Sequence, residues 1–434
     1  MADHYCSLAV WSIVAAVTLC HSALAQDRRA VTEPVAPGNI CARLTPSGKN
    51  DTSDLKKAIA HCPAGATVYL AGGSFLSGPL EMKSGVTLWL ERGTTLFATA
   101  EPTAYDKGLG HCGRIDSRRD GCRPFINFSN TRGGGIYGDG IIDGQGGEVM
   151  VGSAESWWQL ARRAQTEGGN QNAPRLIQID HAQDITLHGI TLRNAPNFHV
   201  AMHRVEGATF WGITIDAPAD ARNTDGIDPG ASQDVTITHS VIRTGDDNVA
   251  IKADNGSTRY VSIIDNYFGW GHGMSIGSEL KSGVSDILVR NLTLDGTTSG
   301  LRIKSDRSRG GVVERVTFEN VCLRDNRWPI NFETRYDTHA HGDSIPVYRQ
   351  IVLRHVHGTG GTLVMRGLDP NHALGVSLDD VRFADSAVWQ VENVVVTVGP
   401  SGVWPPVPGG ARVPPSRVWN GCASGSLSQI GGRA

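Results

Sequence analysis

The chain has 434 residues, of which 53 are glycine and only 6% are aromatic. This composition suits many short strands joined by tight turns better than long helices, because glycine permits turn conformations that other residues disfavour. The formal net charge is −3 at pH 7 and the chain has no basic tract. Both features argue against a nucleic-acid-binding protein, which needs a positive field.

The first 25 residues have the pattern of a secretory signal peptide. An apolar run at 9–19 is too short to span a bilayer. The small residues Ala23 and Ala25 follow it and predict cleavage before Gln26. The N-terminal end has no Lys or Arg, which departs from that pattern, and the alternative is a buried N-terminal segment. We expect an exported, extracellular protein with no membrane span after cleavage.

Six cysteines remain if residues 1–25 are removed, and an even number in an exported chain favours disulfides. The expected pairs, each close in sequence, are Cys41 with Cys62 and Cys112 with Cys122. Cys322 and Cys422 stay unassigned. The spacing Cys-x-x-Cys is absent and the histidines do not cluster with cysteines, so we expect no zinc site.

Residues 53–63 predict a short amphipathic helix with Leu55, Ala58 and Ile59 on one side. Alternating apolar and polar residues then recur along the middle of the chain. The repeats begin at Ile185, Ala208, Val235, Val261, Ile287, Val316, Ile351 and Val376. Strand-type alternation at such a period is typical of a solenoid whose coils stack on one another.

No helical pattern lies between these strands, which argues against alternating βα units. We therefore predict an all-β chain that forms a parallel β-helix over residues 26–398, with the helix at 53–63 covering its N-terminal end. A Pro/Gly-rich tail at 399–434 is expected to be irregular.

A second set of strands is predicted by isoleucines about one coil apart. These residues are Ile227, Ile251, Ile276 and Ile303. Since neighbours on a strand face opposite sides, the isoleucines would stack in the core while Asp228, Lys252 and Lys304 project from one outer face. Stacked strands lie about 4.8 Å apart, so residues a whole coil apart in sequence can share one site.

Polar motifs fall at this second register on consecutive coils. They are Asn223-Thr224-Asp225, Gly245-Asp246-Asp247, Gly271-His272-Gly273 and Arg302-Ile303-Lys304. Alone, each motif is more often a turn, a solvated pair or a surface row than a site. Their coincidence predicts one site with aspartates, an imidazole and two cations. Calcium is the structural alternative for the aspartates, but the cations would compete with a metal, so none is expected.

Glycoside hydrolysis uses such a cluster, because one carboxylic acid protonates the leaving oxygen while carboxylate activates a water on the opposite side of the sugar. Crowded carboxylates raise the pKa of one of the group, which keeps a proton available. The cations Arg302 and Lys304 suit an anionic sugar, whose carboxylate they can bind.

The chain resembles the polygalacturonases of glycoside hydrolase family 28, most closely the secreted bacterial endopolygalacturonases. The resemblance covers roughly residues 35–397. Its site motifs are ARNTDGIDP (221–229), TGDDNVAIK (244–252), GWGHGMSIGSE (269–279) and GTTSGLRIKSD (296–306). Further matches are GIIDGQGG (140–147), SWW (156–158), PRLIQI (174–179) and PNFHV (196–200).

The resemblance implies a right-handed single-stranded parallel β-helix of the pectin-lyase-like type, inversion at the anomeric carbon, and neither metal nor cofactor. By motif, Asp246 would be the general acid, and Asp225 with Asp247 would hold and activate water. His272 would tune the acid or hold the carboxylates. The candidates for substrate binding are Arg302, Lys304, Asn223 and Tyr336.

The predicted function is therefore a secreted, monomeric polygalacturonase. Endo action is favoured because no extra domain or long insertion is evident that would close the groove. The alternatives are an exo-acting enzyme on the same substrate, a rhamnogalacturonan hydrolase, a calcium-dependent pectate lyase that cleaves by β-elimination, and a β-helical protein that binds polysaccharide without cutting it.

Overall fold

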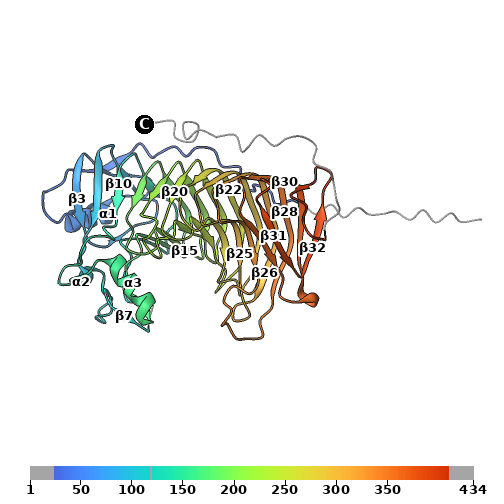
Figure 1. Cartoon of the computed structure of the whole chain (residues 1–434). Helices are drawn as coiled ribbons and strands as arrows, with labels where there is room; N and C mark the ends of the chain where they lie inside the picture. The colour runs from blue at the N-terminus through green and yellow to red at the C-terminus, as the bar shows by residue number, and fades with distance from the viewer. Residues whose placement is uncertain (1–23, 118–119, 410–434) are drawn as a thin grey trace, which may run out of the picture.

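The computed structural model describes residues 24–117 and 120–409. The predicted signal peptide lies outside this part up to residue 23, as do Cys422 and the rest of the tail from residue 410. Within it, parallel strands stack coil upon coil along one axis, so the chain progresses from one end of an elongated solenoid to the other (Figure 1). The predicted parallel β-helix is confirmed.

One face of the solenoid is a sheet of eleven strands. In order these are β4 (Leu80–Glu81), β8 (Ile126–Ser129), β12 (Ile177–Asp180), β15 (Val200–His203), β18 (Ile227–Asp228), β21 (Val249–Ile251), β23 (Met274–Gly277), β25 (Ser299–Lys304), β27 (Trp328–Glu333), β29 (Thr362–Arg366) and β31 (Val388–Glu392).

The other faces form a continuous sheet of twenty strands. These are β1 (Ile40–Leu44), β2 (Thr67–Leu70), β3 (Gly73–Ser77), β5 (Thr87–Leu90), β6 (Thr94–Ala98), β9 (Gly135–Tyr137), β10 (Ile141–Asp143), β13 (Gln183–His188), β14 (Thr191–Arg193), β16 (Glu206–Trp211), β17 (Thr214–Asp216), β19 (Gln233–Thr238), β20 (Val241–Arg243), β22 (Thr258–Phe268), β24 (Val284–Asp295), β26 (Gly311–Arg324), β28 (Pro346–Gly358), β30 (Leu374–Phe383), β32 (Val394–Val398) and β33 (Val403–Trp404).

The predicted repeats pair as expected. Ile185 is aligned with Ala208, Ala208 with Val235, and each later start with the next, through Ile351 with Val376. These residues are buried in one apolar core that runs the length of the solenoid. Burial of the same strand position on every coil therefore sets the register of the stack.

One predicted register is wrong. Ile251, Ile276 and Ile303 stack on one another, but Ile227 is aligned with Val249 and not with Ile251. The shift is two residues, so Ile227 still faces the core because side chains alternate with a period of two. The turn before β21 is shorter than the isoleucine spacing indicates.

The helix predicted at 53–63 is observed as α1 (Thr52–His61), with Leu55 and Ile59 buried. It packs against β1, β3 and β4 near the N-terminal end, and its role as a cover for that end stays a prediction. Both expected disulfides are present, Cys41–Cys62 and Cys112–Cys122. β33 pairs with β30 inside the stretch predicted as tail, and the boundary at 398 stays a prediction.

Several elements that the sequence analysis did not predict project beside the solenoid. They are α2 (Pro102–Tyr105), α3 (Trp157–Glu167), the antiparallel pair β7 (Ile115–Asp116) and β11 (Asn170–Gln171), and the 3-10 turn Pro370–His372. Near the N-terminal end, α2, β7 and α3 hang below the coils (Figure 1). α3 begins with a capping box in which Ser156 and Gln159 each accept a hydrogen bond from the other's backbone N–H, a signal readable from sequence.

Candidate active site

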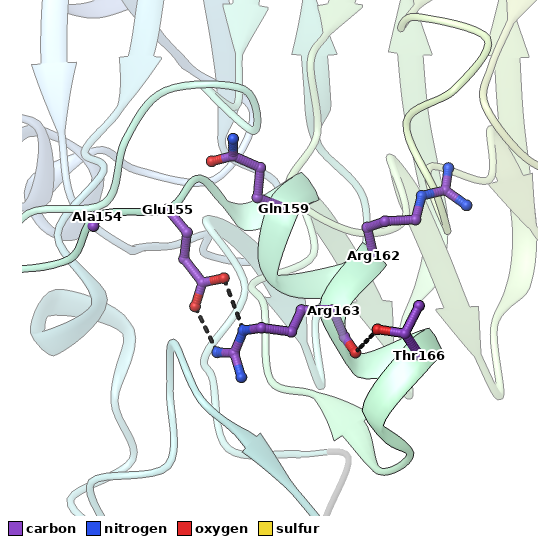
Figure 2. A pocket seen from close by; sticks show the side chains of 6 residues that line it. All are labelled: Ala154, Glu155, Gln159, Arg162, Arg163 and Thr166. Carbon is purple, nitrogen blue, oxygen red and sulfur yellow. Dashed lines mark hydrogen bonds and ion pairs between the residues drawn. The ribbon is translucent and has the colours of Figure 1, made fainter.

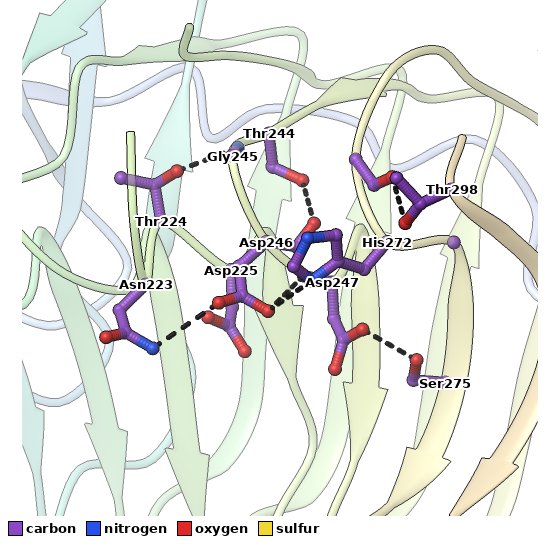
Figure 3. A network of polar contacts seen from close by, with 12 residues as sticks. Asn223, Thr224, Asp225, Thr244, Gly245, Asp246, Asp247, His272, Ser275 and Thr298 are labelled. Carbon is purple, nitrogen blue, oxygen red and sulfur yellow. Dashed lines mark hydrogen bonds and ion pairs between the residues drawn. The ribbon is translucent and has the colours of Figure 1, made fainter. Parts of the chain in front are cut away.

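The four predicted motifs meet on the eleven-stranded face. The aspartates and His272 lie on the turns that precede β18, β21 and β23, while Arg302 and Lys304 lie on β25 itself. A cavity of about 610 Å³ is lined by all eight predicted site residues. They are Asn223, Asp225, Asp246, Asp247, His272, Arg302, Lys304 and Tyr336. Figure 3 shows Asn223, the three aspartates and His272 converging on one point.

The corrected register explains how Asp225 reaches the cluster. Alignment of Ile227 with Val249 places Asp225 level with Asp247, and the N–H of Gly226 donates to the Asp247 carbonyl at 2.9 Å. On the other side, the N–H of His272 donates to the Asp246 carbonyl at 2.8 Å. Backbone hydrogen bonds between coils therefore hold three successive turns together.

Asp246 is bound through both carboxylate oxygens. Oδ1 lies 2.9 Å from Nδ1 of His272, and Oδ2 accepts a hydrogen bond of 3.4 Å from Nδ2 of Asn223. Burial acts to raise the pKa of Asp246, but the hydrogen bond and charge of His272 and the charge of Lys304 outweigh it. The net effect holds the pKa of Asp246 well below its usual range.

Asp247 is 2% exposed and is surrounded by donors. Lys304 donates to Oδ2 at 2.7 Å, Ser275 donates to Oδ1 at 2.7 Å, and Nη1 of Arg302 lies 3.5 Å from Oδ1. Burial opposes ionisation here as well, yet the charges of Lys304 and Arg302 lower the pKa of Asp247. The two cations expected to bind substrate thus also hold a carboxylate of the cluster.

Asp225 has the opposite electrostatic character. It is 4% exposed, and its Oδ1 has no hydrogen-bond partner among the residues that the structure describes. Burial first, and then the negative charges of Asp228 and Asp246, raise the pKa of Asp225 well above its usual range. In the ligand-free protein, Asp225 therefore holds a proton more firmly than Asp246 does.

Asp228 and Lys252 complete the network, and the sequence analysis did not assign them to the site. Nζ of Lys252 lies 2.7 Å from Oδ2 of Asp228 and 3.7 Å from Oδ2 of Asp225. Burial, opposed by Lys252, raises the pKa of Asp228 to about 6. The sequence nevertheless carries a signal for this network, because both side chains are predicted to project from the same outer face. A lysine and two aspartates on one side of adjacent coils are within ion-pair range.

Tyr336 lies at the rim of the cavity and is 42% exposed. The guanidinium of Arg302 and the ammonium of Lys304 each lie 5.4 Å from the centre of its ring. This distance is within the range of a cation–π interaction. The structure therefore places Tyr336 beside the cations with which the sequence analysis grouped it.

The donor set does not suit calcium. Ligand atoms of Asp246, Asp247 and His272 come within 4.8 Å of one another. However, calcium takes six to eight oxygen ligands, whereas the oxygens here accept hydrogen bonds from Lys304, Ser275 and Asn223 or lie beside His272. An ammonium 2.7 Å from Asp247 occupies the position that a cation would take.

A second hollow of about 640 Å³ continues the cavity toward the N-terminal coils. The walls shared by the two hollows are Phe198, Arg222, Asn223, Lys252 and Glu279. A shallow depression that shares Arg162 with the first cavity lies along α3 and the residues before it, where Glu155 and Arg163 form an ion pair of 2.6 Å (Figure 2). That depression contains none of the aspartates described above, which line the groove instead.

A family model described as glycosyl hydrolases family 28 matches residues 53–400. The chain belongs to glycosyl hydrolases family 28. This family 28 protein is 43% identical to an endo-polygalacturonase of Pectobacterium carotovorum subsp. carotovorum over 381 residues, which covers 86% of this chain and 94% of the relative. It is 40% identical to a polygalacturonase of Ralstonia solanacearum, covering 77% and 72% of the two chains.

Among solved structures, the family 28 protein matches a polygalacturonase from Erwinia carotovora ssp. carotovora with a TM-score of 0.81 and 41% identity. The match covers 86% of this chain and 100% of the other. Within residues 24–117 and 120–409, no helix has the length and apolar character that a membrane crossing requires.

Proposed function

We propose that this protein hydrolyses the α-1,4 bonds between galacturonate units of polygalacturonate, cutting within the polymer. The observation that carries the proposal is the shared cavity of Asp225, Asp246, Asp247, Arg302 and Lys304. The aspartates supply proton transfer and water activation, and the cations suit the carboxylate that distinguishes galacturonate from a neutral sugar. The names of the bacterial relatives support the same substrate.

In the proposed mechanism, Asp246 protonates the leaving glycosidic oxygen. Its low pKa in the ligand-free protein means that the proton must come from a neighbour, and Nδ1 of His272, 2.9 Å from Oδ1, is placed to supply it. Asp246 accepts the Nδ1 proton of His272 and transfers it to the glycosidic oxygen as the glycosidic bond breaks. His272 is thus a proton donor to the acid as well as its anchor.

Asp225 and Asp247 would hold the attacking water. Asp247 is ionised and fixed by Lys304 and Ser275, so it can accept a hydrogen bond from water without moving. The unpaired Oδ1 of Asp225 offers a second acceptor once that residue is ionised. This water attacks on the opposite side of the ring from Asp246 and gives its proton to one of these two carboxylates, which yields inversion at the anomeric carbon.

The shape of the groove supports endo action. Its two hollows share walls, and their lining runs from Gln178 on β12 to Lys304 on β25. These strands are five coils apart, or ~24 Å at ~4.8 Å per coil. A polymer lying along this groove would extend past the catalytic aspartates, which a site limited to chain ends does not require.

We further propose that the protein acts outside the cell as a monomer. The signal-like residues 1–25 and the two disulfides support export, because disulfides persist in oxidising compartments.

The test is product analysis on polygalacturonate over time. Endo hydrolysis predicts that viscosity falls much faster than reducing ends appear, with saturated oligomers of mixed length as early products. Viscosity that falls in proportion to reducing ends, with monomer or dimer alone released, would replace endo with exo action. Unsaturated products that absorb in the ultraviolet and disappear with a chelator would overturn hydrolysis.

A further inference from the structure

The second hollow contains a guanidinium that no role assigned so far explains. Arg175 lies just before β12 and lines this hollow with Gln178 and Phe198. Its Nη1 donates to Oε1 of Gln178 at 2.9 Å, and its guanidinium carbon lies 5.8 Å from the centre of the Phe198 ring. These contacts hold the side chain at the wall of the groove.

Arg175 has no carboxylate within ion-pair distance in the described part of the chain. Burial lowers the pKa of its guanidinium, although the charges of Asp228 and Asp180 oppose this effect. Both of those aspartates are bound elsewhere: Asp228 to Lys252 at 2.7 Å, and Asp180 to His203 at 3.0 Å. A cation that is partly removed from water in this way gains from an anionic ligand that brings its own carboxylate.

The hollow is also in line with the catalytic cluster. From β12 to β21 the face advances by three coils, or ~14 Å at ~4.8 Å per coil. Lys252 lies where the two hollows join, since it lines both. One polymer chain can therefore occupy both hollows at once.

We propose that the second hollow binds a galacturonate unit distant from the bond that is cut, with Arg175 as the anchor for its carboxylate. The inference rests on the proposed function, because it takes the ligand to be part of the same polygalacturonate chain. The planar guanidinium can bind a carboxylate through two parallel N–H donors, which a lysine cannot do. Arg175 is thus a substrate-binding residue that acts only on long substrates.

The experiment compares Arg175→Gln, Arg175→Lys and the matched control Arg204→Gln with the unaltered protein. Arg204 is exposed on the coil of β15 and does not line the hollow. KM and kcat are measured on oligogalacturonates of increasing length. Circular dichroism and the unfolding midpoint of each variant check that it folds.

Arg175→Gln should raise KM on the order of tenfold for oligomers long enough to fill both hollows, with kcat and the values for the shortest cleaved oligomer unchanged. Arg175→Lys should have an intermediate KM, and Arg204→Gln should match the unaltered protein. Equal KM for Arg175→Gln and the unaltered protein at every length would overturn the inference. So would the same loss at every length.

Direct binding separates this inference from the proposed function. Calorimetry with long oligogalacturonates, in an Asp246→Asn background that leaves them intact, should show weaker binding when Arg175→Gln is added. If this loss of binding is observed but the unaltered protein does not cut polygalacturonate, the proposed function is overturned and the inference about Arg175 stands. Unchanged binding would overturn the inference even if hydrolysis is normal.

Discussion

Nζ of Lys304 lies 2.7 Å from Oδ2 of Asp247, and both side chains are almost fully buried. The cation assigned to the substrate is therefore already engaged with a catalytic aspartate. Without this ammonium, the buried carboxylate of Asp247 keeps only the more distant guanidinium of Arg302 as a positive partner, so its pKa shifts upward.

Lys304→Ala should therefore change the pH dependence of the reaction. Lys304 lowers the pKa of Asp247 against the effect of burial, so its removal raises that pKa. Because Asp247 must be ionised to hold water, the acid limb of the profile of kcat/KM against pH should move to higher pH by about one unit or more. Lys281→Ala, at an exposed lysine, is the control. An acid limb that stays in place would show that Lys304 does not set the ionisation of Asp247.

Arg302 is the cation that is freer to bind substrate. Its Nη1 is 3.5 Å from Asp247, and its buried Nε has no hydrogen-bond partner among the described residues. Arg302→Ala should therefore weaken binding of unesterified substrate more than that of methyl-esterified substrate, because the ester has no charge to pair with. KM values on the two substrates measure the difference. An equal increase in KM on both substrates would show that Arg302 does not bind the carboxylate of the substrate.

The sequence predicts the stack well because one property dominates it. Each inward position, such as Val261 or Ile287, must be apolar on every coil, and this requirement is visible as a repeated pattern. The same logic brings Asp246, His272 and Lys304 together without a structure. These three residues thus follow from period and alternation, whereas the level of Asp225 depends on the corrected register.

The details that the sequence analysis did not predict depend on turn lengths and on charge pairing. Ile227 aligns with Val249 because the intervening turn is short, and a spacing of isoleucines does not report turn length. Asp228 and Lys252 look like solvent-facing charges in sequence, yet Asp228 is buried and Lys252 is partly buried between neighbouring coils. The elements α2, β7 and α3, which project beside the solenoid, lie in a stretch that lacks the strand repeat, so the sequence analysis did not predict them.

The buried Asp228 predicts how stability depends on pH. Its pKa is about 6 in the folded protein, whereas an unfolded chain has a value of ~3.9. Below pH ~4 Asp228 is protonated in both the folded and the unfolded state, so its pKa shift does not affect stability. As the pH rises through 6, the shift lowers the free energy of unfolding by up to ~3 kcal/mol. In Asp228→Asn the free energy of unfolding should fall less over this range than in the unaltered protein.

Urea unfolding at a series of pH values measures this difference. Asp139→Asn, at an exposed aspartate, controls for the loss of one carboxylate. If Asp228→Asn shows the same decline between pH 4 and 7 as the unaltered protein, then burial does not perturb Asp228.

The core beneath the site should be sensitive to volume. Ile276 is fully buried and stacks between Ile251 and Ile303 on the coil that carries His272. Ile276→Ala should lower the free energy of unfolding by about 2–5 kcal/mol, and the milder Ile276→Val by about 0.5–1.5 kcal/mol. Urea unfolding gives both values. Similar small losses for the two variants would contradict the close packing of this isoleucine ladder.

The most direct test of the account is the turnover of Asp246→Asn on polygalacturonate. If Asp246 is the general acid, kcat should fall about 100-fold or more while binding of oligogalacturonate changes little, because asparagine keeps the shape of the side chain but has no proton to give. Asp216→Asn, on β17 and outside the groove, should retain normal turnover. A kcat for Asp246→Asn close to that of the unaltered protein would contradict the assignment of this cluster as the catalytic site.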